Sequence, residues 1–267
     1  MVIITDSTNN IDKQRLNYAI SIVQAHKNTG QVNSIGTLGE KSLHAALKWY
    51  YEPDGSRHEI PIGEYIADIV GEDGIIEIQT RSLSHLKPKL SGLLELCRVT
   101  VVHPVIVNRR IICVSCDTGE VISVRKSPKH ENIYTEMREL YSLRDMLTNR
   151  NLTLKFPLLS ADEHRTFGVK TKRRKKQRTR MGEYVSDLVP TDIIDEISLS
   201  DASDYSVLIP EGLPVEFGAA EFASAAGTDT ANARMALNLL IRMKLASQTG
   251  KIGNRKLYRI ASESKSK

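Results

Sequence analysis

The spacing of hydrophobic residues predicts an alternation of helices and strands along the chain. Residues 16–23 and 39–50 place apolar side chains three, four and seven positions apart, which is the spacing of one helix face. Runs of β-branched residues then predict strands at 66–70 and 75–78. Because Gly71-Glu72-Asp73-Gly74 between these runs is typical of a turn, the two strands should form a hairpin.

The same kind of pattern continues through the middle of the chain. A leucine-rich helix is expected at 86–97, and the apolar run at 99–107 reads as one buried strand. Residues 110–124 predict a second hairpin, because an Asp-Thr-Gly turn interrupts them. We expect a helix at 131–146 and extended structure at 153–159.

The first hairpin carries the residues with the clearest chemistry. If it closes symmetrically about its turn, Val70 pairs with Ile75 and Asp68 faces Glu77. Directly opposed Cβ atoms lie roughly 4.5–5.5 Å apart, and like charges placed there are destabilising. A hard divalent cation would compensate, and strand alternation directs Gln79 to the same face as Glu77. The alternative is that both carboxylates are polar residues at the mouth of a hairpin.

The pattern Asp68…Glu77-Ile-Gln79 resembles the signature of the PD-(D/E)XK nuclease superfamily, a carboxylate on one strand and (D/E)-x-K on the next. The resemblance covers about residues 35–110. It implies an α/β fold with a restriction-endonuclease-like core and a mixed sheet. It also implies that Asp68 and Glu77 hold Mg²⁺, or Mn²⁺ as an alternative. Gln79 departs from the family's lysine, because it can orient the attacking water but supplies no positive charge.

The same resemblance assigns two further residues. Glu40 lies on the inward edge of the first core helix, where many members of the superfamily place a third acidic residue. The alternative is that Glu40 favours a helix N-terminus through the helix dipole. The charge missing at Gln79 is assigned to Lys87 or Lys89 on the following helix, or to a second ion. Lys87 is preferred because it is nearer in sequence, and His44 is expected to be structural or to contact substrate.

Composition bounds the class of protein. The 267 residues are enough for two small domains, and the net charge of +5 favours a polyanionic partner. Cys97, Cys113 and Cys116 have no disulfide-framework spacing, which fits a reducing compartment. A zinc site built from these cysteines and His103 is the alternative to three small buried hydrophobes. The sequence has no long apolar run, so we expect a soluble cytoplasmic protein without a membrane partner.

A basic block at 170–180 interrupts the pattern and is expected to be a loop or arm, because its charges repel one another. Such an arm would bind DNA phosphates through Lys172, Arg173, Arg174, Lys175, Lys176, Arg178 and Arg180. A nuclear localisation signal and a plain solvated linker are the alternatives. The acidic segment 191–206 that follows is expected to fold back on the arm when DNA is absent.

Residues 211–261 resemble a winged helix-turn-helix. An Ala-rich helix at 217–227 ends at a glycine, a second helix follows Thr228-Asp229, and two strands surround 250–254. The resemblance places the second helix in the major groove and the hairpin against the backbone. The implied base contacts are Thr230, Asn232 and Arg234, and the implied phosphate contacts are Lys251, Arg255 and Lys256. A winged helix used for protein contacts is the alternative.

These features together predict a Mg²⁺-dependent DNA endonuclease with a DNA-binding C-terminal domain. The expected organisation is a nuclease-like domain at 1–168, a linker at 169–210, the winged helix at 211–261 and a frayed tail at 262–267. The competing class is a non-catalytic DNA-binding protein or regulator on a degenerate nuclease fold, which Gln79 favours. An RNA substrate and a homodimer stay open.

Overall fold

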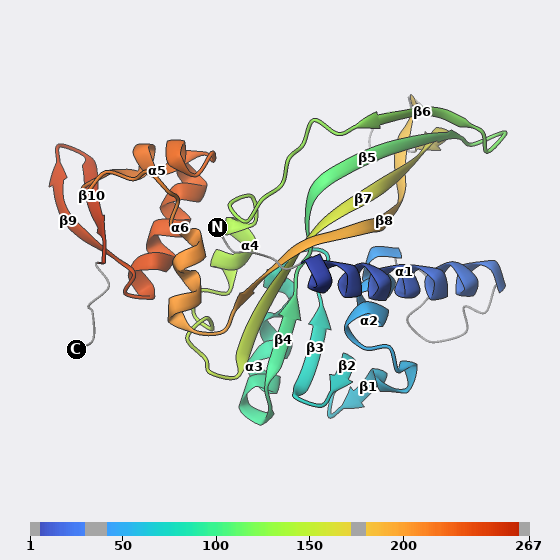
Figure 1. Ribbon diagram of the computed structural model, residues 1–267, viewed down its shortest axis with the longest axis horizontal. Coiled ribbons are helices and arrows are strands. Elements are labelled where there is room, and N and C mark those ends of the chain that lie inside the picture. The colour runs from blue at the N-terminus through green and yellow to red at the C-terminus, as the bar shows by residue number, and fades with distance from the viewer. Residues whose placement is uncertain (1–5, 30–41, 172–179, 262–267) are drawn as a thin grey trace. The chain divides into compact units, whose positions relative to one another are not determined.

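The computed structural model describes residues 6–29, 42–171 and 180–261 and has a mixed α/β fold (Figure 1). Eight strands belong to one mixed sheet, and two further strands form a small antiparallel sheet. In the part of the chain that is described, no helix combines the length and apolar character needed to cross a bilayer.

The chain separates into two compact units, and each is discontinuous in sequence. The first unit comprises Met1–Gly71, Ile106–His130 and Pro157–Glu196. The second comprises Glu72–Val105, Glu131–Phe156 and Ile197–Lys267. Each unit is therefore assembled from three separate stretches of the sequence.

Two helices of the first unit pack against each other: α1 (Asp6–Thr29) and α2 (Ser42–Tyr51). The apolar faces expected from the sequence are buried, which confirms both helices. The buried side chains on these faces are Leu16, Ala19, Val23, Leu43, Ala46, Leu47 and Tyr50. Tyr50 also ties the helices together, because its hydroxyl donates to Asp12 over 3.0 Å and its carbonyl accepts from Arg15 over 3.1 Å.

The short helix η1 (Gly55–Arg57) leads into an antiparallel hairpin of β1 (His58–Ile62) and β2 (Tyr65–Gly71). The ladder pairs His58 with Ile69 and Ile62 with Tyr65, and Gly63 at the turn has a φ of 59°. Ala67 and Ile69 are buried, whereas Ile66 is exposed. Alternation therefore directs Asp68 away from the face that Ala67 and Ile69 bury.

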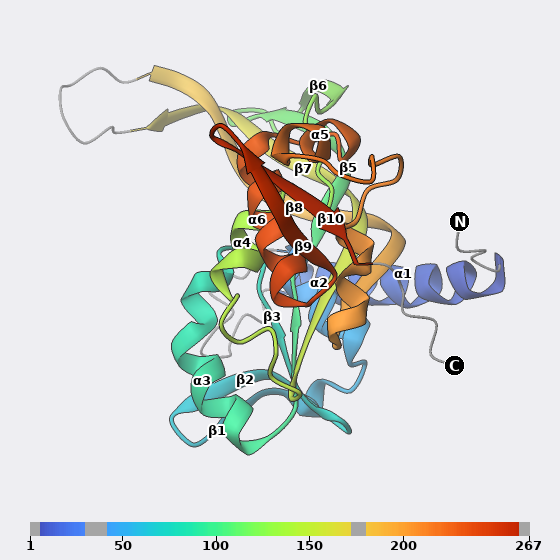
Figure 2. The same ribbon diagram turned by 90° about the vertical axis from the view of Figure 1, so that its left-hand side faces the viewer.

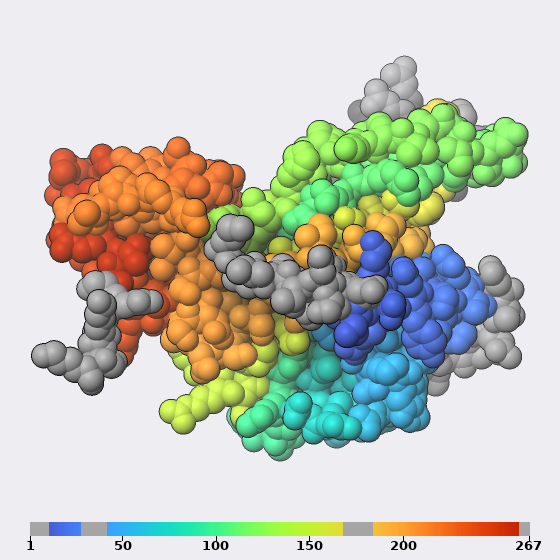
Figure 3. All heavy atoms as spheres, in the orientation of Figure 1, coloured from blue at the N-terminus to red at the C-terminus, as the bar shows by residue number. Residues whose placement is uncertain are grey.

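Four long strands complete the first unit and run partly beyond it: β5 (Val105–Ser115), β6 (Val121–Lys126), β7 (Leu152–Thr171) and β8 (Arg180–Leu199). The hairpin expected at 110–124 is confirmed, since β5 and β6 pair antiparallel. Gly119 at its turn has a φ of 71°, a conformation that glycine adopts without strain. All six side chains of β6 are exposed, and the strand is visible on the surface in Figure 3.

Two predicted elements differ from the structure between residues 99 and 146. The single strand expected at 99–107 is two strands, because β4 (Val99–Val102) ends before His103-Pro104 and β5 begins afterwards. Pro104 has no N–H to donate to a ladder, which explains the break. The helix expected at 131–146 is reduced to α4 (Met137–Ser142). The Asn132 side chain accepts from the N–H groups of Tyr134 and Thr135, which holds a turn in place of helix.

The linker expected at 169–210 also differs in part from the structure. β8 continues to Leu199 and η3 (Ala202–Leu208) follows it, so the acidic segment 191–206 is regular structure. The linker was predicted because of the basic block at 170–180, but the strands β7 and β8 extend to this block from both sides. Lys172, Arg173, Arg174, Lys175, Lys176 and Arg178 lie outside the described residues.

The second unit contains β3 (Gly74–Ile78), η2 (Leu83–Leu86), α3 (Lys87–Leu96) and β4. Pro88 lies in the first turn of α3, where a missing N–H costs nothing, and Leu90, Leu93 and Leu94 are buried. β3 and β4 are parallel, and β4 in turn pairs parallel with the start of β7. The strand expected at 75–78 and the helix expected at 86–97 are confirmed.

The C-terminal part of the second unit contains α5 (Ala219–Ala225), α6 (Thr230–Arg242), β9 (Ala246–Ile252) and β10 (Arg255–Ile260). β9 and β10 form the small antiparallel sheet, which lies in front of α6 in Figure 2. Phe217 forms an isolated bridge to Tyr258, so a third segment joins this hairpin. Asp229 caps α6 by accepting from the N–H of Asn232 over 2.8 Å. The two helices and the hairpin expected here are confirmed.

The eight-stranded sheet has the hydrogen-bonded order β1-β2-β3-β4-β7-β5-β6, with β8 paired to β7. Antiparallel pairs and parallel pairs both occur, so the sheet is mixed. The register that would place Asp68 opposite Glu77 stays a prediction.

Trp49, the only tryptophan in the sequence, gives a direct reading of the charge on His58. The two rings meet edge-on with their centroids 4.7 Å apart. Partial burial lowers the pKa of His58 below its ordinary 6.5. Since the folded pKa lies below the unfolded one, this group contributes stability above pH 6.5 that is lost as the pH falls. We expect protonated His58 to quench Trp49 fluorescence with a midpoint below pH 6.5.

Two substitutions test this assignment. His58→Gln should remove the transition, whereas His26→Gln should leave it in place, although His26 lies 6.0 Å from the Trp49 ring. A wild-type midpoint at or above pH 6.5 would contradict the role of burial.

Candidate functional site

Asp68, the first predicted metal ligand, lies in the middle of β2 and is partly buried. His44 of α2 approaches it, with the Nε2 atom 3.5 Å from the Asp68 Oδ2 atom, and both side chains are 23% exposed. α2 is fixed by its buried apolar face, so the imidazole is held beside the carboxylate by the packing of the helix. His44 was expected to be structural or to contact substrate, and the geometry makes it a neighbour that positions Asp68.

Glu77, the second predicted ligand, is the more deeply buried carboxylate. Its side chain is 3% exposed, and the Lys89 Nζ atom of α3 lies 2.5 Å from its Oε2 atom. A buried carboxylate is costly unless it is paired, and this ion pair supplies the compensation. Lys87, the lysine preferred from the sequence, begins α3, and it is Lys89 that contacts Glu77. The structure thus brings a positive charge to the carboxylate from the predicted helix but from the other lysine.

Gln79 directly follows β3, and its backbone N–H and carbonyl both have hydrogen-bond partners. Its N–H donates to the Val102 carbonyl over 2.9 Å, and its carbonyl oxygen lies 2.6 Å from the His103 Nδ1 atom. The Gln79 side-chain oxygen accepts from the N–H of Arg81 over 3.4 Å. His103 is buried, and its Nε2 atom lies 3.1 Å from Glu136. From the sequence His103 was only a candidate zinc ligand. Its contacts with Gln79 and Glu136 were not predicted, because no local motif indicates them.

The other candidate ligands are distributed differently. Glu40 lies outside the described residues, so its place beside the carboxylates stays a prediction. Cys113 is buried, Cys97 is partly buried and Cys116 is exposed. Among the described residues, no group of three or more His, Cys, Asp or Glu side chains is arranged to hold a metal ion. The alternative zinc site is therefore not formed by the three cysteines and His103.

The predicted base-contacting residues lie in the first two turns of α6. Thr230 is its first residue and Arg234 is exposed on its outer face. The Asn232 amide is engaged in the cap, 3.3 Å from both the Thr228 hydroxyl and the Asp229 carboxylate. It is thus occupied in starting the helix.

α6 carries two further exposed polar residues that were not predicted from the sequence as candidates for DNA binding. Asn238 and Arg242 lie four and eight positions after Arg234, so all three share one helix face. Arg242 also lies 3.4 Å from Asp145. The spacing of four along the predicted helix was the signal that would have found them.

The hairpin that follows concentrates positive charge. Lys251 and Lys256 are paired directly across the β9–β10 ladder, and both are exposed. Like charges opposite one another are unfavourable, and a bound polyanion would relieve that repulsion. Arg255, a predicted phosphate contact, instead pairs with Glu221 of α5. Hydrogen bonds to the Glu221 carboxylate from backbone N–H groups, together with the nearby guanidinium, lower the pKa of Glu221.

Comparison with known proteins places the chain in a family. A family model described as "Domain of unknown function (DUF8091)" matches residues 41–200, and the chain belongs to this family. An "Uncharacterized protein" of Treponema pallidum (strain Nichols) is 32% identical over 228 residues, which are 85% of this chain and 87% of the relative. No solved structure matches. The family match includes Asp68, Glu77, Lys89 and the strands up to β8.

Proposed function

We propose that this member of the DUF8091 family is a Mg²⁺-dependent DNA endonuclease of PD-(D/E)XK type. The observation that carries the proposal is the order α2, β1, β2, β3, α3, β4, with one carboxylate on β2 and one on β3. This is the order of elements that the resemblance requires. The turn between Asp68 and Glu77 is short, which supports a shared site for the two carboxylates.

The donor types fit a magnesium ion. Mg²⁺ prefers oxygen ligands and is usually bound by one or two carboxylates together with waters and phosphate oxygens. Asp68 and Glu77 would hold it, with Glu40 as the third candidate from the sequence. When bound, the ion supplies a water of lowered pKa and screens the charge on the scissile phosphate.

Lys89 supplies the positive charge that members of the superfamily obtain from the lysine at the position of Gln79. Its ammonium group contacts Glu77 directly and is largely shielded from water, so its charge is screened less than that of a surface lysine. In the proposed site Lys89 stabilises negative charge on the phosphate, whereas Gln79 orients the attacking water. His44 holds the Asp68 carboxylate in position.

DNA binding is assigned to α6 and to the β9–β10 hairpin. The exposed face formed by Arg234, Asn238 and Arg242 would lie in the major groove, where Arg and Asn recognise base edges. Lys251 and Lys256 would neutralise backbone phosphates. The order of η3, the Phe217 bridge, α5, α6, β9 and β10 supports a winged-helix arrangement.

The test is incubation of the full chain with plasmid and with single-stranded DNA in Mg²⁺, Mn²⁺ or EDTA. We expect cleavage in the presence of either metal and none in EDTA. Binding without cleavage under every condition would favour the second candidate, a non-catalytic DNA-binding protein. Gln79 in place of lysine is the observation that supports that candidate.

The salt dependence of binding provides a separate check on the hairpin. Replacing Lys251 and Lys256 together by alanine should weaken binding to all duplex sequences alike. The slope of log K against log salt should fall by about 0.9 for each phosphate that the hairpin no longer neutralises. Fluorescence anisotropy of a labelled duplex at several salt concentrations measures both effects.

The matched control removes two other exposed charges from the same unit, Arg98 and Arg150. Arg98→Ala/Arg150→Ala changes the net charge equally and should leave the salt slope unchanged. An equal decrease of the slope in both double variants would mean that net charge, and not the hairpin, sets the affinity.

A further inference from the structure

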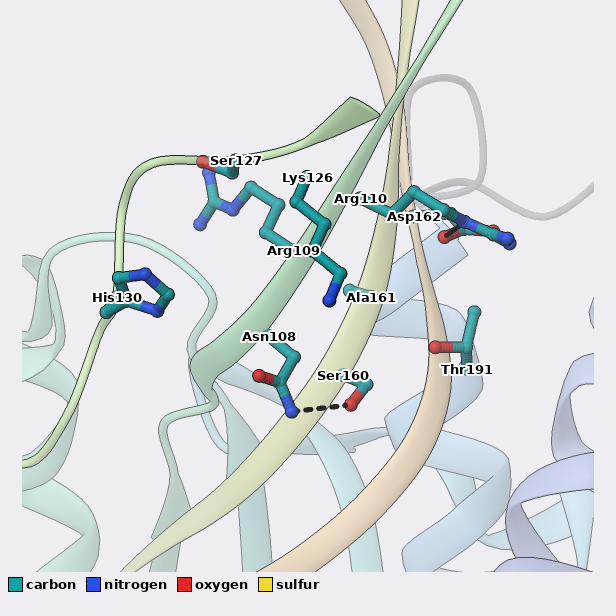
Figure 4. A pocket seen from close by; sticks show the side chains of 10 residues that line it. All are labelled: Asn108, Arg109, Arg110, Lys126, Ser127, His130, Ser160, Ala161, Asp162 and Thr191. Carbon is teal, nitrogen blue, oxygen red and sulfur yellow. Dashed lines mark hydrogen bonds and ion pairs between the residues drawn. The ribbon is translucent and has the colours of Figure 1, made fainter. Parts of the chain in front are cut away.

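The first unit contains an open cavity that the proposed nuclease chemistry does not use. Its volume is about 540 Å³, and residues of β5, β6, β7 and β8 line it together with the segment just after β6 (Figure 4). Small-molecule sites commonly span roughly 300–1,000 Å³, so this volume admits a compact organic ligand. Nine of its ten lining residues are polar or charged, and Ala161 is the exception.

At one edge of the cavity, arginines are paired with carboxylates of the protein. Arg110 donates twice to Asp162, over 2.8 and 2.5 Å, and Arg109 donates to the buried Glu163 over 2.8 Å. Burial would raise the pKa of Glu163, but hydrogen bonds from Arg165 and Arg109 outweigh it and keep the pKa below its ordinary value. These arginines therefore already have carboxylate partners within the protein.

Two other residues that line the cavity, Lys126 and His130, present nitrogen atoms without such partners in the described part of the chain. Among the residues that the structure describes, neither the Lys126 ammonium nor the His130 ring has a hydrogen-bond or ion-pair partner. Lys126 is also paired across the ladder with Arg110, an arrangement of like charges that is unfavourable by itself. In Figure 4 the Lys126 amine points into the cavity toward Asn108 and Ser160.

Neutral hydrogen-bonding groups surround this lysine. The Asn108 amide donates to the Ser160 hydroxyl over 3.3 Å at the base of the cavity, and Thr191 of β8 presents a hydroxyl nearby. The segment 126–130, which carries Lys126 and His130, is attached to β5 because the N–H of Ser127 donates to the Arg109 carbonyl over 2.8 Å. One ammonium, one imidazole and several hydroxyl and amide groups form a set that suits an anion attached to a polar body.

We propose that this cavity binds a phosphate monoester of about the size of a mononucleotide. Lys126 and His130 donate to the phosphate, and the Lys126 ammonium supplies the positive charge, because hydrogen bonds from charged donors to phosphate oxygens are stronger than those from neutral donors. Asn108, Ser160 and Thr191 contact the hydroxyl groups of the sugar. The phosphate monoester belongs either to a free nucleotide or to the 5′ end of a DNA strand, and the two sources share this chemistry.

Calorimetric titration of the full chain with adenosine 5′-monophosphate tests the site. We expect saturable binding of the monophosphate and none of adenosine, which lacks the anion. Lys126→Gln should weaken binding at least tenfold. Lys129→Gln is the matched control, because Lys129 is exposed three residues away and does not line the cavity, and its affinity should stay within twofold of wild type.

A 5′-phosphorylated dinucleotide and its unphosphorylated form distinguish the two sources. Tighter binding of the phosphorylated dinucleotide than of the mononucleotide assigns the site to strand ends, and the reverse assigns it to free nucleotides. Either result supports the phosphate site. Absence of binding for both phosphorylated probes, or equal affinity in wild type and Lys126→Gln, would overturn it. The site is independent of the nuclease proposal, since a variant without cleavage should still bind the monophosphate.

Discussion

Glu77→Gln is expected to abolish DNA cleavage in Mg²⁺ while leaving DNA affinity close to that of wild type. The amide is a poor ligand for a hard cation, and a metal's charge stabilisation is worth several kcal/mol in the transition state. A change of that size corresponds to a rate lower by about a thousandfold. Binding should persist because it is assigned to α6 and the β9–β10 hairpin, and not to β3.

Loss of activity alone would not distinguish catalysis from folding, because Glu77 is a buried member of an ion pair. Removing one partner of a buried pair costs about 3–5 kcal/mol, whereas replacing both by neutral groups of similar volume is often nearly neutral. Glu77→Gln should therefore lower the free energy of unfolding. Adding Lys89→Met should recover much of that stability, because the neutral amide then faces a neutral side chain.

The double variant separates the two roles. If Glu77 holds the metal, Glu77→Gln/Lys89→Met should be nearly as stable as wild type in urea and still fail to nick plasmid. Glu95→Gln is the matched control, since Glu95 is an exposed carboxylate on the same helix as Lys89. It should change neither stability nor cleavage. A stable double variant that cleaves at the wild-type rate would remove Glu77 from the mechanism.

The elements around this pair were predictable because their signals are local. β-branched runs on each side of a Gly-bounded turn specified β2 and β3, and a leucine stripe specified α3. The choice between Lys87 and Lys89 was not local. Residues i and i+2 of an α-helix point in directions about 200° apart around its axis. The packing of α3 therefore decides which of the two lysines reaches Glu77.

Other features depend on the pairing of distant parts of the sequence. The cavity combines Asn108, Lys126, Ser160 and Thr191 from four strands, and no motif links these positions. The basic block suggested that the linker began at 169, whereas the strand β8 that follows is specified by its pairing with β7. A sequence window reports composition and periodicity, and neither carries information about a strand's partner.

A second large change in stability is expected at Asp187 of β8, which joins both helices of the first unit. Its carboxylate lies 2.6 Å from the Lys27 Nζ atom of α1. At the start of α2 it accepts from the Ser42 hydroxyl over 2.5 Å and from the Ser42 N–H over 3.1 Å. Asp187 thus acts as a capping group supplied from a distant strand, which satisfies one of the unpaired N–H groups at the helix start.

Asp187→Asn should lower the free energy of unfolding by about 1–3 kcal/mol at neutral pH, the usual cost of disrupting hydrogen bonds to a partly buried charged group. The Lys27 side chain is 49% exposed, so solvent screens its share of the interaction and the hydrogen bonds from Ser42 carry most of the effect. Burial by itself would raise the pKa of Asp187. Hydrogen bonds from Lys27 and Ser42 outweigh that effect and hold the pKa below its ordinary 3.8.

The stabilisation by Asp187 should depend on pH. Because the folded pKa of Asp187 lies below the unfolded value, its stabilisation is fully present above about pH 4 and is lost as the pH falls below 3.8. The difference between wild type and Asp187→Asn in urea unfolding should therefore be greatest at pH 7 and should shrink at acidic pH.

Asp195→Asn is the control, since Asp195 accepts the N–H of the next residue, as Asp187 does, but is exposed. That control should stay within about 0.5 kcal/mol of wild type. A decrease of stability in Asp187→Asn that is the same at every pH would show that the carboxylate's charge is not what holds α1 and α2 to β8.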